Sequence, residues 1–185
     1  TLRQNHEVDP DLVRLSKRMS RALRHRPAEF GLSLDAGGWV DVDDLVTAMG
    51  LPHRPVTREL VDLVVAMSDK QRFAYDDTRT RIRANQGHSV PVDLGLEPAT
   101  PPDALFHGTV DRFVAAIRRE GLRPMRRHHV HLSPDRETAT QVGKRRGSPA
   151  ILVVDAAGMS RAGHVFYRSE NGVWLTDAVP PAFLC

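Results

Sequence analysis

Five consecutive residues, Leu23-Arg24-His25-Arg26-Pro27, combine side chains that are well suited to phosphate chemistry. Arginine presents a planar fork of N–H donors that matches the oxygens of a phosphate group. Histidine titrates near neutral pH and can give or take a proton. The proline is expected to end the preceding helix, which places Arg24, His25 and Arg26 in its last turn. The same residues could also form an ordinary solvated helix end, so this stretch by itself leaves both interpretations open.

Two histidines in the second half stand beside hydroxyl residues at the ends of predicted strands. His107 is followed by Gly108 and Thr109, and Ser133 stands two residues after His131. A lone histidine is more often structural, and zinc is the other candidate. The sequence has no pair of histidines four residues apart on a helix and no carboxylate placed to complete a ligand set. We therefore expect no metal site.

The composition bounds the class of protein. With 41% hydrophobic and 26% charged residues, the 185-residue chain is typical of globular proteins. Only three of its 26 basic residues are lysines. Such arginine enrichment favours a phosphate-rich partner, although high-GC codon usage has the same effect. A single cysteine, Cys185, and the lack of a membrane-length apolar run predict a cytoplasmic protein without membrane contacts.

The first half, residues 1–92, is predicted to contain helices followed by a β-hairpin. Asp9 and Pro10 supply the cap and first residue of a helix. Periodicity and turn residues then predict two helices, at about 43–49 and from Thr57, and strands at 39–42, 71–75 and 80–84. This order is typical of a winged-helix domain, which often binds nucleic acids but also binds proteins.

The second half, residues 104–185, is predicted to be a separate α+β unit. Residues 91–103 contain four prolines and no regular period, so a linker is expected at 93–103. Helices are predicted at 111–120, with Phe113 and Ile117 facing inward, and from an N-cap at Ser133 to Gly143. Strands at 104–106, 130–133, 150–155, 165–167 and 173–176 would form a small, mostly antiparallel sheet.

Taken together, these segments resemble the RNA 2′-phosphotransferase family. The resemblance is carried in the first half by Leu15-Ser16-Lys17, Leu23-Arg24-His25-Arg26-Pro27, Gly31-Leu32-Ser33-Leu34-Asp35, Gly38-Trp39-Val40, Ser68-Asp69-Lys70-Gln71-Arg72-Phe73 and Ile82-Arg83-Ala84-Asn85-Gln86-Gly87-His88-Ser89. In the second half it is carried by His107-Gly108-Thr109, Val130-His131-Leu132-Ser133, Val142-Gly143-Lys144-Arg145 and Asn171-Gly172-Val173-Trp174-Leu175-Thr176. The motifs span almost the whole chain in the correct order, and their combination is far more specific than any one of them.

The resemblance implies a fold and an activity. The fold would be α+β, with a winged-helix RNA-binding lobe at 1–92 and an NAD-binding, ADP-ribosyltransferase-like lobe at 104–185. An internal RNA 2′-phosphate would be transferred to NAD⁺ through an ADP-ribosylated RNA. The products would be RNA with a 2′-hydroxyl, ADP-ribose 1″,2″-cyclic phosphate and nicotinamide. A monomer is expected, because both lobes of the site belong to one chain.

Four catalytic residues carry over from the family by motif: Arg24, His25, Arg72 and Arg127. Guanidinium groups placed in advance would stabilise the charge that gathers on phosphate oxygens during hydroxyl attack, and a histidine would move the proton. Arg126 is adjacent to Arg127 and is the alternative. Arg127 is preferred because it keeps the spacing to His131.

The resemblance also implies a set of NAD-binding residues. The two strand ends would supply His107, Gly108, Thr109, His131 and Ser133, with the glycine letting the backbone approach the dinucleotide. The following helix start would supply Asp135 and Thr138 for ribose or pyrophosphate, and Arg145 a phosphate contact. From the first lobe, the polar loop Gln86, Gly87, His88 and Ser89 would reach NAD or RNA phosphate.

Two other functions remain open at this point. One is an ADP-ribosyltransferase that stops after the first step and modifies terminal phosphates of RNA or DNA. The other is a winged-helix nucleic-acid binder whose second half only senses NAD. Composition and periodicity do not distinguish them from the RNA 2′-phosphotransferase.

Overall fold

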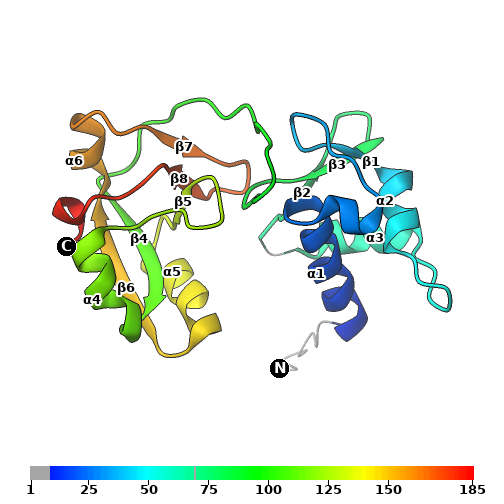
Figure 1. The fold of residues 1–185 in the computed structure, drawn as a ribbon, viewed down its shortest axis with the longest axis horizontal. Helices are drawn as coiled ribbons and strands as arrows, with labels where there is room; N and C mark the ends of the chain where they lie inside the picture. Colours follow the sequence, from blue (N-terminus) through cyan, green and yellow to red (C-terminus); the bar gives the residue numbers. More distant parts are fainter. Residues whose placement is uncertain (1–8, 69) are drawn as a thin grey trace, which may run out of the picture. The chain divides into compact units, whose positions relative to one another are not determined.

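The computed structural model describes residues 9–68 and 70–185, so Asp69 of the quoted motif lies outside the described residues. The chain divides into two compact units, Thr1–Leu94 and Gly95–Cys185, each with its own hydrophobic core (Figure 1). The division falls inside the stretch 93–103. Two of its residues are nevertheless held by their own unit: the Asp93 amide donates to the Ala36 carbonyl within the first unit, and Pro98 forms a bridge with Tyr167 within the second.

The first unit begins with helix α1, Pro10–Arg24. Its N-cap is Asp9, whose carboxylate accepts from the Asp11 amide at 2.8 Å, as the Asp-Pro pair predicts. The helix ends at Arg24 with His25 as C-cap. Pro27 does more than stop it, because the proline starts a 3-10 turn, η1, Pro27–Phe30. His25 and Arg26 therefore occupy the corner between two helical segments.

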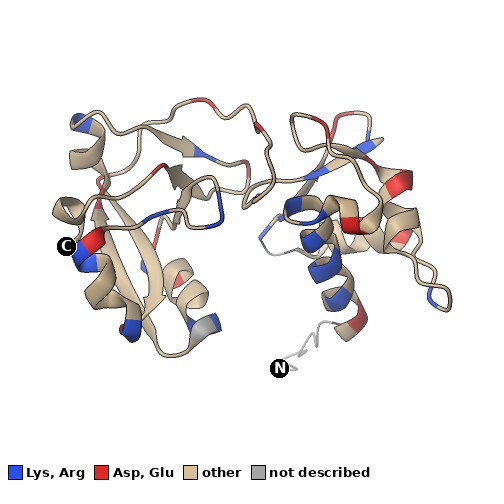
Figure 2. Ribbon diagram, viewed as in Figure 1, with Lys and Arg blue, Asp and Glu red and all other residues tan. Residues whose placement is uncertain are grey.

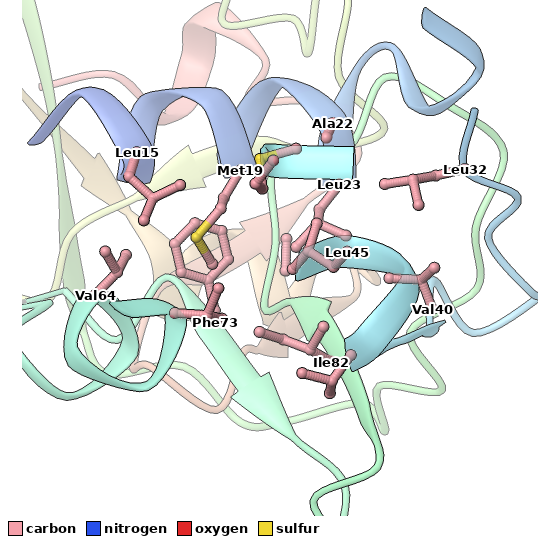
Figure 3. Close-up of a cluster of buried hydrophobic side chains, with 14 residues drawn as sticks. Leu15, Met19, Ala22, Leu23, Leu32, Val40, Leu45, Val64, Phe73 and Ile82 are labelled. Carbon is pink, nitrogen blue, oxygen red and sulfur yellow. The ribbon is translucent and has the colours of Figure 1, made fainter. Parts of the chain in front are cut away.

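Three short strands and two more helices complete the first unit. They are β1 (Val40–Asp41), α2 (Val42–Met49), α3 (Arg58–Ala66), β2 (Phe73–Tyr75) and β3 (Arg81–Ala84), and the sheet order is β1-β3-β2 with antiparallel pairing. The register pairs Val40 with Ile82 and Phe73 with Ala84, which puts these apolar side chains on the face that packs against the helices. Figure 3 shows Met19 of α1 beside Phe73 in that core.

Strand alternation leaves arginines and an aromatic residue on the other side of this sheet. Arg83 lies with its guanidinium carbon 4.5 Å from the centroid of the Trp39 ring, and Arg81 lies 5.6 Å from it. The turn before Arg81 is held by Asp76, whose carboxylate accepts from the Arg81 and Thr80 amides. The hydrogen bond from the Arg81 backbone N–H is the main cause of a lowered pKa of Asp76. The Asp76 carboxylate therefore stays ionised to lower pH than an ordinary aspartate.

The second unit contains two small antiparallel sheets, β4-β6 and β5-β8-β7. Its elements are β4 (Ala104–Val110), α4 (Asp111–Glu120), β5 (Val130–Leu132), α5 (Arg136–Gly143), η2 (Lys144–Arg146), β6 (Pro149–Asp155), α6 (Ala156–Arg161), β7 (Phe166–Arg168), β8 (Trp174–Thr176) and η3 (Pro181–Phe183). The hairpin predicted at Asn171-Gly172 is present, with Gly172 at φ 78°. Both units are therefore mixed α+β structures with antiparallel sheets, as the sequence predicts.

Two sequence predictions in this unit are wrong in detail, and one short helix was missed. Phe113 does not face inward: it is 40% exposed beneath the Arg112 guanidinium, and Val114 joins Ile117 against the core instead. The N-cap of α5 is Asp135 rather than Ser133. The short helix α6 was not expected. Both Phe113 and Val114 have helical spacing to Ile117, so the sequence pattern allows either of them to face the core. The packing of α4 against the rest of the unit selects Val114.

None of the helices in the described residues is long and apolar enough to cross a membrane.

Candidate functional site

In the first unit, the end of α1 is joined to the residue just before β2. The Arg24 guanidinium donates through Nη2 to the Arg72 carbonyl oxygen at 3.3 Å. The Arg72 side chain is itself fixed, because Nη1 donates to Ser68 Oγ at 3.3 Å and the Arg72 amide donates to the same oxygen. Both arginines are half-buried. Two residues 48 positions apart, each a predicted catalytic residue, thus lie at one place on the first unit.

His25 is oriented by Ser89. The distance from His25 Nδ1 to Ser89 Oγ is 2.9 Å, and the Ser89 amide donates to the Arg24 carbonyl at 2.8 Å. A hydroxyl can either donate or accept, so this contact fixes the orientation of the His25 ring through Nδ1. Three predicted catalytic residues, Arg24, His25 and Arg72, are gathered within this unit.

Asn85, which sequence analysis did not select, fixes the backbone that carries Arg72. Its amide N–H donates to the Arg72 carbonyl at 3.0 Å, and its side-chain Nδ2 donates to the Gln71 carbonyl at 2.5 Å. Gln71 has φ 39°, a conformation that ordinary residues avoid and that needs such support. Asn85 is 6% exposed. Its place in the polar loop after β3 was the available signal, but its partners are set only by the fold.

The loop that follows Asn85 is only partly exposed. Gln86 is half-buried and Ser89 is exposed, whereas Gly87 is buried with φ 87°. His88 was expected to reach a ligand, yet its side chain is 2% exposed and packs beside Gly38. The histidine therefore supports the loop from inside the unit, and among these four residues the side chains of Gln86 and Ser89 are the ones placed to contact a ligand.

In the second unit, three predicted site residues form a chain of contacts. His107 Nδ1 lies 3.1 Å from the His131 carbonyl, so this nitrogen carries the proton. Arg127 Nη1 donates to His131 Nδ1. Because a guanidinium can only donate, His131 Nδ1 is the acceptor in this contact. It is Arg127 that makes this contact with His131, and Arg126 is exposed.

The strands that carry these histidines are nearly independent of each other. Strands β4 and β5 share one isolated bridge, between Phe106 and Ser133, with amide-to-carbonyl distances of 2.9 and 2.7 Å. Beyond that bridge the His107 side chain, in place of a backbone ladder, joins β4 to β5. The expectation that both histidines stand at strand ends is wrong, because His107 lies in the middle of β4 and His131 in the middle of β5. Their rings are half-buried between the two strands.

Gly108 and Thr109 serve packing, which corrects the reason proposed from sequence. A Cβ on Gly108 would lie 1.9 Å from the Ala139 carbonyl oxygen of α5, and one on Gly143 would lie 2.9 Å from the Thr109 carbonyl. The two glycines therefore let α5 lie directly on β4. The space beside Gly108 is filled by the protein's own backbone, and Thr109 is 4% exposed, so neither side-chain position is open to a dinucleotide.

The start of α5 is already occupied by an acidic side chain. Asp135 accepts from the Thr138 amide at 2.7 Å and from the Thr138 hydroxyl at 2.9 Å. A carboxylate here uses the donors that would otherwise bind a phosphate, and it repels a second anion. Its oxygens are instead suited to accept hydrogen bonds from hydroxyl groups. Arg145 is exposed in η2, and no contact from it to the other predicted site residues is seen in the described structure.

The loop before β5 carries permanent positive charge on its arginines. Burial lowers the pKa of His129, although Asp177 at 3.7 Å acts in the opposite direction. The lowered pKa favours the neutral form of the His129 ring, and the permanent positive charges of this loop are those of Arg123, Arg126 and Arg127. The described residues contain no cluster of three or more His, Cys, Asp or Glu side chains that could hold a metal ion.

Comparison with known proteins gives a consistent result. Residues 10–178 match the model of the family described as RNA 2′-phosphotransferase, Tpt1 / KptA family. A probable RNA 2′-phosphotransferase of Streptomyces coelicolor is 60% identical over 172 residues, which cover 93% of each chain. The corresponding protein of Streptomyces griseus is 58% identical, covering 93% of this chain and 95% of the relative. That of Nostoc punctiforme is 53% identical, with coverage of 95% and 97%.

Proposed function

The chain belongs to the RNA 2′-phosphotransferase family, and from this premise we propose that it transfers an internal 2′-phosphate of RNA to NAD⁺. The observation that supports the proposal most directly is the arrangement in the first unit. Arg24, His25 and Arg72 are held together by contacts to backbone carbonyls and to Ser68 and Ser89, which is an arrangement suited to a phosphate and a proton transfer. We further propose that the first unit is a winged-helix lobe and the second an ADP-ribosyltransferase-like lobe.

NAD⁺ supplies an electrophilic ribose carbon and a leaving group, nicotinamide, which departs with the electrons of the broken C–N bond. Arg24 and Arg72 bind and orient the attacking 2′-phosphate, whose oxygen is already anionic. In the second step the 2″-hydroxyl of the attached ADP-ribose attacks the phosphorus. The bond between phosphorus and the RNA 2′-oxygen breaks, and that oxygen leaves. The attacking hydroxyl loses one proton and the leaving oxygen gains one. His25 moves that proton, and the guanidiniums stabilise the charge on the non-bridging oxygens.

The second unit fits NAD⁺ through its own donor and acceptor set. His107 and His131 present half-buried rings at the β4–β5 junction, and Arg127 brings a positive charge against His131. Asp135 at the start of α5 fits a ribose hydroxyl better than a pyrophosphate, because its carboxylate accepts hydrogen bonds and repels anions. We propose Arg127 as the fourth catalytic residue.

A direct assay distinguishes this proposal from its alternatives. The protein is incubated with NAD⁺ and an oligonucleotide that carries one internal 2′-phosphate. Dephosphorylated RNA together with ADP-ribose cyclic phosphate is the expected result. A persistent ADP-ribosylated product would identify an enzyme that stops at the first step, and intact NAD⁺ a binding protein. Full dephosphorylation without NAD⁺ would refute the mechanism, and so would loss of activity in EDTA.

One surface argues against the binding-protein alternative. The exposed residues of α3, which would be the groove-reading helix of a winged-helix regulator, include Glu59, Leu60 and Leu63. The cation of this helix, Arg58, is paired with Asp62 at 3.8 Å and with Asp43 at 3.9 Å. Helices that read DNA grooves rely on cationic and amide side chains at such positions.

Replacing Asn85 with alanine is expected to lower kcat by about 10- to 100-fold while KM for RNA changes little. The substitution removes the Nδ2 donor to Gln71, so the segment that carries Arg72 loosens, and a displacement of about 1 Å is enough for such a loss. Steady-state kinetics on folded protein measures it.

Asn171→Ala in the β7–β8 turn is the matched control, and kcat should stay near wild type. Asn85→Asp, which keeps the shape but lacks the donor, should not restore kcat. Wild-type kcat in Asn85→Ala would show that Asn85 does not position Arg72.

A further inference from the structure

Helix α1 carries a stripe of cations that runs along its exposed side and ends at Arg24. The stripe consists of Arg14, Lys17, Arg21 and Arg24, at spacings of three, four and three residues. At about 100° per residue these positions lie on one side of the helix, opposite the buried Leu15, Met19, Ala22 and Leu23. Figure 2 shows the basic positions following one another along α1 after an acidic first turn.

The stripe keeps an excess of positive charge after its ion pairs are counted. Asp11 is shared by Arg14 and by Arg54, the latter at 3.1 Å, and Glu29 is shared by Arg21 at 2.6 Å and Arg26 at 3.5 Å. Each carboxylate therefore faces two arginines. The side chains of Arg14 and Arg21 are 66% and 61% exposed. Exposed pairs of this kind contribute little to stability, so these arginines can exchange a carboxylate for a phosphate at small cost.

We propose that this stripe binds the RNA backbone on one side of the 2′-phosphorylated nucleotide, an inference that rests on the proposed function. Arg24 belongs to the phosphate site, so the stripe leads from that site along the helix. Arg14 and Arg24 are separated by about 15 Å of helix axis, a length over which one nucleic-acid strand carries roughly four phosphates. These contacts are to phosphates, so they favour longer RNA substrates without distinguishing between base sequences.

The test compares substrates of two lengths in the double variant Lys17→Gln, Arg21→Gln. One substrate is a dinucleotide that bears the 2′-phosphate, and the other is a 20-nucleotide RNA with the same group at its centre. The variant should raise KM for the long RNA about tenfold at 0.15 M salt, because it loses two phosphate contacts. Each lost contact to a single strand should also make the slope of log KM against log salt concentration smaller by roughly 0.7. KM for the dinucleotide and kcat for both substrates should match wild type.

A matched control removes two exposed cations from another helix: Arg118→Gln, Arg119→Gln on α4 should leave KM for both RNAs unchanged. Equal KM increases on the short and long substrates would overturn the proposal, and so would an unchanged KM on the long one. Binding of the 20-nucleotide RNA without its 2′-phosphate is measured in parallel. If wild type binds it and the double variant binds it more weakly, while no turnover of either substrate occurs, the stripe stands and the proposed function fails.

Discussion

ADP-ribosylated RNA is expected to accumulate when His25 is replaced with alanine. The first step needs no proton transfer, since the attacking phosphate oxygen is anionic and nicotinamide leaves as a neutral molecule. The second step needs a proton taken from one hydroxyl and given to another oxygen, which is the role proposed for His25. Its rate should fall by about 10²- to 10⁴-fold, with a smaller change in the first step. Single-turnover reactions with RNA labelled at the 2′-phosphate resolve the two steps.

The control for this variant is His53→Ala, which removes an exposed loop histidine of the first unit and should leave both rates unchanged. Ser89→Ala should give an intermediate effect on the second step, because the His25 ring is retained but loses its 2.9 Å partner. If His25→Ala slows both steps equally, the histidine acts in binding rather than in proton transfer, and wild-type rates would exclude it from the site.

Replacing Gly108 with alanine is expected to destabilise the second unit by at least about 3 kcal/mol. The new Cβ would lie 1.9 Å from the Ala139 carbonyl oxygen, so helix α5 would have to move away from β4. The backbone of a packed helix cannot give way as the end of a flexible side chain can. Urea unfolding followed by circular dichroism measures the loss.

Gly163→Ala separates steric overlap from backbone strain. Gly163 has φ 92°, and nothing lies within 4 Å of the position that a Cβ would take, so its substitution should cost only about 1–2 kcal/mol of conformational energy. A Gly108→Ala variant no less stable than Gly163→Ala would mean that β4 and α5 are not in close contact, and the space beside Gly108 would again be open to a ligand.

Much of the local structure follows from sequence because its signals act over a few residues. The Asp9-Pro10 start of α1, the Thr57 cap of α3 and the turn at Asn171-Gly172 are each formed by side chains and dihedral preferences within one turn. The motif resemblance likewise identifies the family, which the comparisons confirm. The resemblance to the family predicts a phosphate site at Arg24, His25 and Arg72 before any contact is known.

Contacts between distant residues were decided by the tertiary structure. Arg24 meets the Arg72 carbonyl across 48 positions and His25 meets Ser89 across 64, and no local preference encodes such pairs. The fold also places the Asn85 side chain against the Gln71 carbonyl and buries the His88 side chain. It packs the backbone of α5 into the space beside Gly108. The reason is physical: a residue's chemistry is fixed by its type, but its exposure and partners depend on which segments pack together. The sequence by itself therefore determined which groups can act on phosphate, and the fold determined which of them are held in place to do so.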